Sequence, residues 1–131
     1  ESIERCCAAV RADASLAGAI CANRSVDTLK LVEGNKIVAT PNREFYWVAQ
    51  TPQVFYAKPL MAAYKAALWE GFAGTDDASL VERHGGTVEC VECPRDNIKV
   101  TVPEDLAVAA ATMEQRLVEE GCGRRYGGDP Q

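Results

Sequence analysis

The sequence predicts an α/β fold with a mostly parallel sheet, and three observations support this prediction. The chain has 131 residues, of which 47% are hydrophobic and 25% charged, as in an ordinary globular domain. Segments with helical spacing of apolar residues alternate with short strand-like segments. Residues 16–22 are continuously apolar and rich in small side chains, which is typical of a buried strand in a parallel sheet.

The first forty residues are expected to contain a helix, a strand and a hairpin. Residues 3–12 place their apolar side chains on one helical face, and polar residues 23–30 follow the strand at 16–22. Gly34-Asn35 lies between two alternating runs within residues 29–40. Such a pair is a strong signal for a two-residue β-hairpin.

The segment Trp47–Phe55 follows no simple period. Its two terminal aromatic residues are expected to anchor it in the core, with the neutral polar side chains of Gln50, Thr51 and Gln53 between them. Pro52 fixes its own backbone and disfavours the helical region for Thr51. The segment is therefore either a strand-to-helix corner or a rigid polar wall.

Two helices are expected next. The first covers residues 58–70 and ends at Gly71. Its apolar stripe is formed by Leu60, Tyr64, Ala67 and Leu68. The second begins with Thr75 or Asp76 as its cap and runs to Gly85.

The last part of the chain is expected to form two strands and a long helix. The strands are residues 87–91 and 97–101, and residues 101–104 read as a capping box for the helix. The helix should stop at Gly121, and residues 121–131 should form a flexible tail.

Charge and hydropathy exclude some partners. The formal net charge of −5 argues against duplex nucleic acid, although it permits an anionic small molecule in a local basic pocket. No apolar run approaches the ~20 residues of a membrane span, which argues against a membrane partner. The first residues lack the basic-then-apolar order of a signal peptide.

Six cysteines raise the question of a metal or redox site. Cys90 and Cys93 form a C-x-x-C pair, but a tetrahedral zinc site needs further ligands, and His84 is the only histidine. The favoured interpretation is reduced thiols in a cytosolic type of protein, with no metal site. A small zinc protein using Cys90 and Cys93 is the alternative.

Polar clusters follow several predicted strands, at the sheet edge where α/β folds bind ligands. They are residues 27–28, 50–51 and 99–101. Lys99, just before a helix, suits a phosphate. On spacing alone, a lysine whose stem lies along the strand with its charge in water ranks first.

Four motifs, in this order and at these spacings, carry a resemblance. They are Asp27–Lys30, Ala49–Phe55, Thr75–Ser79 and Asp96–Leu106. Together they resemble the C-terminal part of the 2-C-methyl-D-erythritol 4-phosphate cytidylyltransferases of non-mevalonate isoprenoid biosynthesis, over roughly residues 1–118. Ribitol-phosphate cytidylyltransferases share much of this pattern.

The resemblance implies a nucleotide-diphospho-sugar-transferase-like (Rossmann-like) fold over residues 1–120. It implies a β-arm, residues 28–50, that reaches into the second subunit of a homodimer. The implied reaction joins a polyol phosphate to CMP from CTP and releases pyrophosphate, with Mg²⁺, in the bacterial cytoplasm or the plastid stroma.

The resemblance also implies roles for five residues. Thr28, Arg43, Thr51 and Thr75 correspond to residues that line the sugar-phosphate site, and Lys99 corresponds to a catalytic lysine that neutralises phosphate charge. Three of them have a simpler interpretation, namely Arg43 as a surface charge, Thr51 as a turn residue and Thr75 as a helix cap. Pro41-Asn42 stand where the family usually has valine and aspartate, and Cys93 replaces a common glycine.

The glycine-rich loop that cradles CTP in the family has no counterpart in the sequence. The double glycines, Gly85-Gly86 and Gly127-Gly128, are misplaced for this role. We therefore expect an N-terminally incomplete sheet, no nucleotide-binding residues in this chain, and no turnover by the chain alone. The alternative functions are a ribitol-phosphate-type enzyme and a catalytically dead dimerisation or binding module.

Overall fold

The computed structural model describes residues 1–125, with side chains as far as Glu119. The chain divides into two units, Glu1–Arg95 and a second one that begins at Asp96. Of the predicted tail, residues 126–131 lie outside the described part of the chain. Residues 121–125 continue the last helix, so the helix stop predicted at Gly121 is wrong.

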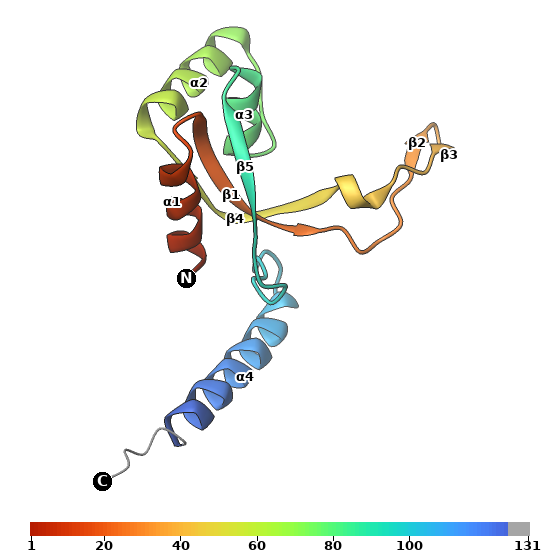
Figure 1. Cartoon of the computed structure of the whole chain (residues 1–131). Helices are drawn as coiled ribbons and strands as arrows, with labels where there is room; N and C mark the ends of the chain where they lie inside the picture. The colour runs from red at the N-terminus through yellow and green to blue at the C-terminus, as the bar shows by residue number, and fades with distance from the viewer. Residues whose placement is uncertain (126–131) are drawn as a thin grey trace. The chain divides into compact units, whose positions relative to one another are not determined.

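Most elements of the first unit have the predicted type (Figure 1). In chain order they are α1 (Ser2–Ala12), β1 (Leu16–Arg24), β2 (Leu31–Glu33), β3 (Lys36–Ala39), the 3₁₀ helix η1 (Arg43–Phe45), β4 (Trp47–Phe55), α2 (Ala57–Glu70), α3 (Asp77–Arg83) and β5 (Thr87–Glu92). The second unit contains α4 (Asp105–Arg125).

The sheet of the first unit has three strands in the order β4-β1-β5. β1 runs parallel to β5 and antiparallel to β4, so the α/β class is confirmed and the sheet is mixed. The first seven residues of β1 are all buried, as expected for a central strand covered on both faces.

Residues of β1 contribute to two core clusters. Ala19 and Cys21 pack with Cys6 and Val10 of α1, and α1 contacts all three strands. Ala17 packs with buried residues of α2 and α3 in the second cluster. The adjacent β4 residues Val54 and Phe55 pack against the first and the second cluster, respectively. Because successive side chains of a strand point to opposite faces, the two clusters lie on opposite sides of the sheet, α1 on one side and α2 with α3 on the other.

Two predicted core residues lie elsewhere. Leu68, expected in the apolar stripe of α2, is 81% exposed and its neighbour Trp69 is 92% exposed. Trp47 is only half-buried and lies outside both clusters, with the Arg24 guanidinium 4.7 Å from its ring centre. Phe55, the other predicted anchor, does pack against the second cluster.

Gly18 allows Phe55 to pack closely on β1. A Cβ atom at position 18 would lie 2.1 Å from Phe55 Cδ1 and 2.7 Å from the Val54 carbonyl oxygen. We expect Gly18→Ala to lower the free energy of unfolding by about 1–3 kcal/mol, the usual cost of overpacking. Denaturant titration measures this loss, and adding Phe55→Leu should recover part of it. An unchanged midpoint in Gly18→Ala would contradict the close approach.

Strand β4 is irregular at the position where its sequence follows no simple period. Ile20 pairs with Gln53 and Ala22 with Ala49, so Cys21 alone lies opposite residues 50–52 of β4. The extra residues form a bulge that includes a cis peptide bond between Thr51 and Pro52. Bulges re-aim side chains and accommodate proline in a strand, so the segment is a bulged strand rather than a corner.

The hairpin predicted at Gly34-Asn35 is confirmed. Both residues have positive φ, as a two-residue turn of this kind requires, and they join β2 to β3. Every residue of β2 and β3 is exposed. Figure 1 shows this hairpin at the end of an arm that extends from β1 and β4. We call residues 25–46 the arm.

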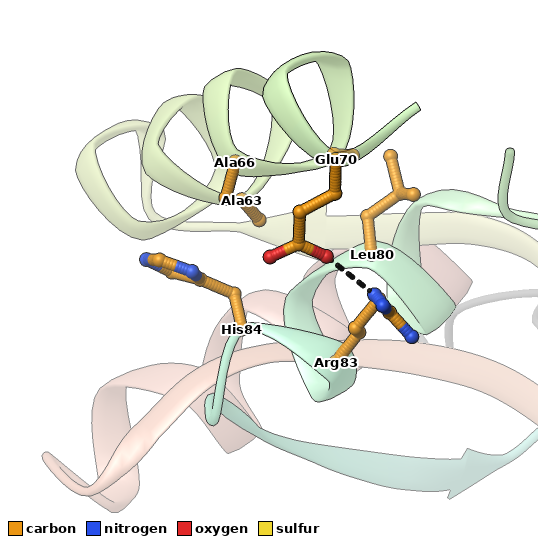
Figure 2. A pocket seen from close by; sticks show the side chains of 7 residues that line it. Ala63, Ala66, Glu70, Leu80, Arg83 and His84 are labelled. Carbon is orange, nitrogen blue, oxygen red and sulfur yellow. Dashed lines mark hydrogen bonds and ion pairs between the residues drawn. The ribbon is translucent and has the colours of Figure 1, made fainter. Parts of the chain in front are cut away.

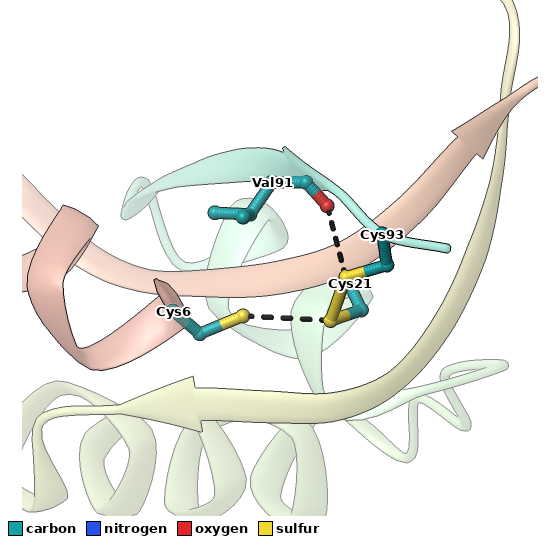
Figure 3. The surroundings of a disulfide bond; sticks show 4 residues. All are labelled: Cys6, Cys21, Val91 and Cys93. Atoms are coloured by element: carbon teal, nitrogen blue, oxygen red, sulfur yellow. Dashed lines mark hydrogen bonds between the residues drawn. A yellow bond between two sulfur atoms is a disulfide. The ribbon is translucent and has the colours of Figure 1, made fainter. Parts of the chain in front are cut away.

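Cys21 and Cys93 form a disulfide, so the prediction of only reduced thiols is wrong (Figure 3). The two residues are 72 positions apart in the sequence, but β1 and β5 are neighbours, which brings their Cα atoms to 5.6 Å. Cys6 is a free buried thiol whose Sγ lies 3.7 Å from Cys21 Sγ. Burial raises the pKa of the Cys6 thiol, and the neighbouring Cys7 adds to this effect.

The second unit differs from its prediction at two places. Residues 97–101 are not a strand; strands need a neighbour to receive their backbone hydrogen bonds, and no strand of the described chain pairs with them. The capping box at residues 101–104 does not form. Instead Asp105, the first residue of α4, accepts hydrogen bonds from the Thr101 and Val102 amides at 2.9 and 3.2 Å.

Candidate functional site

The five predicted site residues fall into two pairs and one single residue. Thr28 and Arg43 lie in the arm, Thr51 lies in β4 and Thr75 just before α3, and Lys99 lies in the second unit. All five are exposed to solvent.

Arg43 is fixed against the start of the arm. Its Nη1 atom donates a hydrogen bond of 2.6 Å to the carbonyl oxygen of Val26, two residues before Thr28. The Ser25 amide donates a hydrogen bond of 2.9 Å to the Tyr46 carbonyl oxygen. This bond joins the two ends of the arm, next to β1 and β4. The structure thus holds the Arg43 side chain beside the segment that carries Thr28.

Thr51 and Thr75 are connected through their neighbours Gln53 and Asp76. The Gln53 Nε2 atom donates to Asp76 Oδ2 at 2.8 Å, and Gln53 Oε1 accepts from the Ala78 amide at 3.3 Å. One amide side chain of β4 therefore binds both the cap and the first turn of α3. Thr75 directly precedes this cap, so it is not the cap itself.

Asp76 caps α3 through a complete capping box with Ser79. Asp76 Oδ1 accepts the Ser79 amide at 2.9 Å, and Ser79 Oγ lies 3.4 Å from the Asp76 amide. Burial alone would raise the pKa of Asp76, but hydrogen bonds from Gln53 and Ser79 stabilise the carboxylate and leave its pKa below the usual value.

This lowered pKa predicts an acid-dependent stability. A group whose pKa is lower in the folded state contributes stability above its unfolded pKa, and this contribution disappears as pH falls through the folded pKa. We expect Asp76→Ala to cost about 1 kcal/mol at neutral pH as a lost cap, and the difference from wild type to shrink below about pH 4. Thermal unfolding across pH measures it.

Asp76→Asn is the matched control, because asparagine also caps helices but does not titrate. Its stability relative to Asp76→Ala should not change with pH. A wild-type advantage that persisted unchanged to about pH 2 would contradict the assigned role of the carboxylate, whose ordinary pKa is about 3.9.

A surface hollow of about 380 Å³ adjoins Thr75. It is lined by Tyr64, Ala67, Leu68, Phe72, Ala73, Gly74, Thr75, Asp76, Asp77 and Leu80. The Tyr64 hydroxyl donates a hydrogen bond to Asp77 Oδ1, which raises the pKa of Tyr64. The hollow has room for a small polar ligand beside Thr75.

A second cavity, between α2 and α3, is much smaller (Figure 2). Its volume is about 10 Å³, room for one water molecule at most. Glu70 and Arg83 form a hydrogen-bonded ion pair at 2.8 Å across it, and the His84 side chain also lines it. This cavity lies between the two helices and is too small for a substrate.

Lys99 lies in an irregular segment held at both ends by residues of its own unit. Asp96 accepts from Arg116 of α4 at 2.7 Å, and Thr101 donates its amide and hydroxyl to Asp105. Both partners belong to α4, so the segment between Asp96 and Thr101 is closed as a loop on that helix.

The described residues contain no group of three or more histidine, cysteine, aspartate or glutamate side chains that could hold a metal ion. Of the C-x-x-C pair, Cys93 forms the disulfide with Cys21, and Cys90 is a free, exposed cysteine. Within residues 1–125, no helix is both long and apolar enough to cross a membrane.

The sequence predicts Gln53 as a neutral polar residue between two aromatic anchors and Asp76 as a candidate helix cap. It does not predict the hydrogen bond between them. Their positions two residues after Thr51 and one after Thr75 were the available signal, because each threonine belongs to a motif that contains one of them.

Comparison with known proteins places this geometry in a family. The family model described as 2-C-methyl-D-erythritol 4-phosphate cytidylyltransferase matches residues 1–115. The enzyme of that name from Geobacter metallireducens is 47% identical over 100 residues, which are 76% of this chain and 43% of the relative. The one from Geobacillus kaustophilus is 44% identical over 110 residues, 84% of this chain and 48% of the relative.

Solved structures of proteins from the same family are also similar to this chain. The 2-C-methyl-D-erythritol 4-phosphate cytidylyltransferase of Francisella tularensis superposes with a TM-score of 0.75 at 34% identity, over 85% of this chain and 52% of that one. The 4-diphosphocytidyl-2C-methyl-D-erythritol synthase of Anaerococcus prevotii gives a TM-score of 0.76 at 32% identity, over 86% and 51%. The chain thus spans about half the length of the proteins it matches.

Proposed function

Because the chain belongs to the 2-C-methyl-D-erythritol 4-phosphate cytidylyltransferase family, we propose that it supplies the sugar-phosphate side of a cytidylyl-transfer site within a longer protein. The observation that carries this proposal is the family match over residues 1–115, which includes all five predicted site residues. The ribitol-phosphate alternative and the catalytically dead module are not favoured, because the matched relatives bear the methylerythritol-phosphate name.

In the proposed reaction, a phosphate oxygen of 2-C-methyl-D-erythritol 4-phosphate attacks the α-phosphorus of CTP. A new P–O bond forms, the bond between the α-phosphorus and the bridging oxygen breaks, and pyrophosphate leaves. Both reactants are anions, so catalysis rests on positioning and charge neutralisation. Lys99 neutralises the crowded phosphates, and the hydroxyls of Thr28, Thr51 and Thr75 donate to substrate oxygens without adding charge.

Mg²⁺ and a second subunit are parts of the same proposal. We expect the protein ligands of Mg²⁺ to lie outside this chain. The arm would pack on a second copy of the chain, because it exposes Val26, Leu31, Val32, Ile37, Val38, Phe45 and Tyr46. We propose that the protein lies in the bacterial cytoplasm or the plastid stroma.

The test is CTP-dependent pyrophosphate release by the longer protein that contains this chain, with a panel of polyol phosphates. We expect turnover with 2-C-methyl-D-erythritol 4-phosphate, and none by residues 1–131 alone. Turnover with ribitol phosphate only would shift the substrate assignment, and no turnover with any acceptor would overturn the proposed function.

Arg43 provides a test of action across subunits. Arg43→Ala in the longer protein should raise KM for the polyol phosphate about tenfold or more, because a guanidinium holds phosphate through paired hydrogen bonds. Arg11→Ala, an exposed arginine of α1, is the matched control and should leave KM unchanged.

Mixed dimers then show whether Arg43 acts in its own subunit or in the partner subunit. A dimer of one Arg43→Ala subunit and one Lys99→Ala subunit keeps one intact site only if Arg43 serves the partner subunit. We expect about half of the wild-type activity from such dimers, following the logic of paired interface residues. Activity as low as in either single variant would contradict action across subunits.

A further inference from the structure

We propose that Cys6, Cys21 and Cys93 form a thiol–disulfide exchange site, in which Cys21 bonds either to Cys93 or to Cys6. The starting point is that the free Cys6 thiol points toward the disulfide between Cys21 and Cys93 (Figure 3). Its Sγ atom is 3.7 Å from Cys21 Sγ. The inference does not depend on the proposed function, and it gives a role to a thiol that the proposed reaction does not use.

The fold brings the three cysteines together from three elements. Cys6 lies on α1, Cys21 on β1 and Cys93 just after β5, and all three belong to one core cluster. None of them is more than 5% exposed. A buried free cysteine usually serves only as a small apolar residue. Cys6 differs from such a residue because its sulfur lies next to a disulfide sulfur.

The exchange balances without an external oxidant or reductant. Cys6 loses its thiol proton to solvent, and its thiolate attacks Cys21 Sγ. The bond between Cys6 and Cys21 forms, while the bond between Cys21 and Cys93 breaks and leaves its electron pair on Cys93, which takes up a proton. The attacking and attacked sulfurs must approach by about 1.7 Å to reach the usual disulfide bond length of about 2.05 Å.

The burial of Cys6 determines how fast this exchange is. Burial raises the pKa of the Cys6 thiol, Cys7 raises the pKa further, and Arg5 lowers it. The cluster residues of β1, β4 and β5 that pack around Cys6 carry apolar side chains or the disulfide itself. Because the thiolate is the attacking species, we expect slow exchange at neutral pH and faster exchange as the pH rises.

The exchange would move a covalent crosslink from one pair of elements to another. The bond to Cys93 ties β1 to the end of β5, whereas a bond to Cys6 ties β1 to α1. In the second state, the end of β5 is held to β1 by backbone hydrogen bonds, such as the one of 3.2 Å from the Cys93 amide to the Ala22 carbonyl oxygen. The chain continues from Cys93 into the segment that carries Lys99. The partner of Cys21 therefore determines whether the strand before that segment is covalently fixed to the sheet.

Peptide mapping without reductant tests the inference on the longer protein that contains this chain. The oxidised protein is incubated at about pH 7 or about pH 9, on either side of the usual thiol pKa. Free thiols are then blocked with N-ethylmaleimide in denaturant, and the protein is digested with trypsin. Cleavage after arginine places Cys6, Cys21 and Cys93 on the separate peptides 6–11, 12–24 and 84–95.

We expect peptide 12–24 to be linked mainly to peptide 84–95 at about pH 7. After a few hours at about pH 9, about one tenth or more of it should be linked to peptide 6–11, since disulfide exchange takes seconds to hours. Absence of this second link at both pH values would overturn the inference.

Cys6→Ser and Cys7→Ser are the matched pair of variants, because peptide 6–11 contains both cysteines. The link between peptides 6–11 and 12–24 should disappear in Cys6→Ser and remain in Cys7→Ser. A link that survives in Cys6→Ser would show random exchange through Cys7 and would overturn the inference. Cys90→Ser should change neither link, because Cys90 is the free cysteine of peptide 84–95.

Cys93→Ser tests the contact between Cys6 and Cys21 directly. This variant leaves the two thiols side by side, and oxidised glutathione should convert them into a disulfide as it takes up their two hydrogens. A variant with wild-type circular dichroism that instead kept both thiols free would overturn the inference. Neither measurement uses turnover, so a protein without cytidylyltransferase activity would end the proposed function and leave the exchange site to be decided by the peptide maps.

Discussion

Lys99→Ala should lower kcat of the longer enzyme about 100- to 1000-fold, with a much smaller change in KM for either substrate. This is the typical loss when one group that stabilises transition-state charge is removed. Charge is most crowded when the acceptor phosphate approaches the triphosphate, so the lysine acts more on the transition state than on the bound substrates. Steady-state kinetics with both substrates varied in turn measure the two parameters.

Lys65→Ala is the matched control, since Lys65 is an exposed lysine of α2 outside the proposed site. It removes the same charge from the protein and should leave kcat within about twofold, because exposed charges far from a site are largely screened by salt. If Lys99→Ala left both kinetic parameters intact, the assigned role of Lys99 would be wrong.

Opening the Cys21–Cys93 disulfide should produce the largest loss of stability of any single change in the first unit. The bond closes a loop between residues 72 positions apart, and the chain-entropy relation gives about 4 kcal/mol for a loop of this length. Part of this stabilisation comes from the unfolded chain, which the crosslink restricts. We expect thermal unfolding of the oxidised protein to shift strongly downward when a dithiol reductant is added.

Cys93→Ala should show the lower stability with or without reductant, whereas Cys90→Ala should behave as wild type. Cys90 is the suitable control because it is a free and exposed cysteine only three residues away. A wild-type protein whose melting temperature did not respond to the reductant would contradict a stabilising crosslink. In a reducing cytoplasm the dithiol form would be the relevant one.

The sequence could predict what depends on neighbouring residues. The continuous apolar run of β1 and the Gly34-Asn35 turn each contain their own signal, and both elements lie where they were expected. The α3 cap was narrowed to Thr75 or Asp76, and the structure selects Asp76. The family motifs supplied the candidate site residues, which stay predictions.

The sequence could not predict what depends on contacts between distant segments. The disulfide follows from the pairing of β1 with β5, and the Gln53–Asp76 bond follows from the approach of α3 to β4. Residues 97–101 have a strand-like sequence, but a strand forms only where a neighbour accepts its hydrogen bonds. Leu68 fits the apolar period of α2, yet the period does not determine how wide the covered face is.

The arm has a consequence for how the protein behaves at low concentration. A two-stranded hairpin with every residue exposed is only marginally stable in water, and β2 and β3 pair with no other strand of the described chain. Its order therefore depends on whatever covers its apolar side chains. If a second copy does so, dilution would release the arm and open residues 25–46 to proteases, while the disulfide-linked sheet behind it stays resistant.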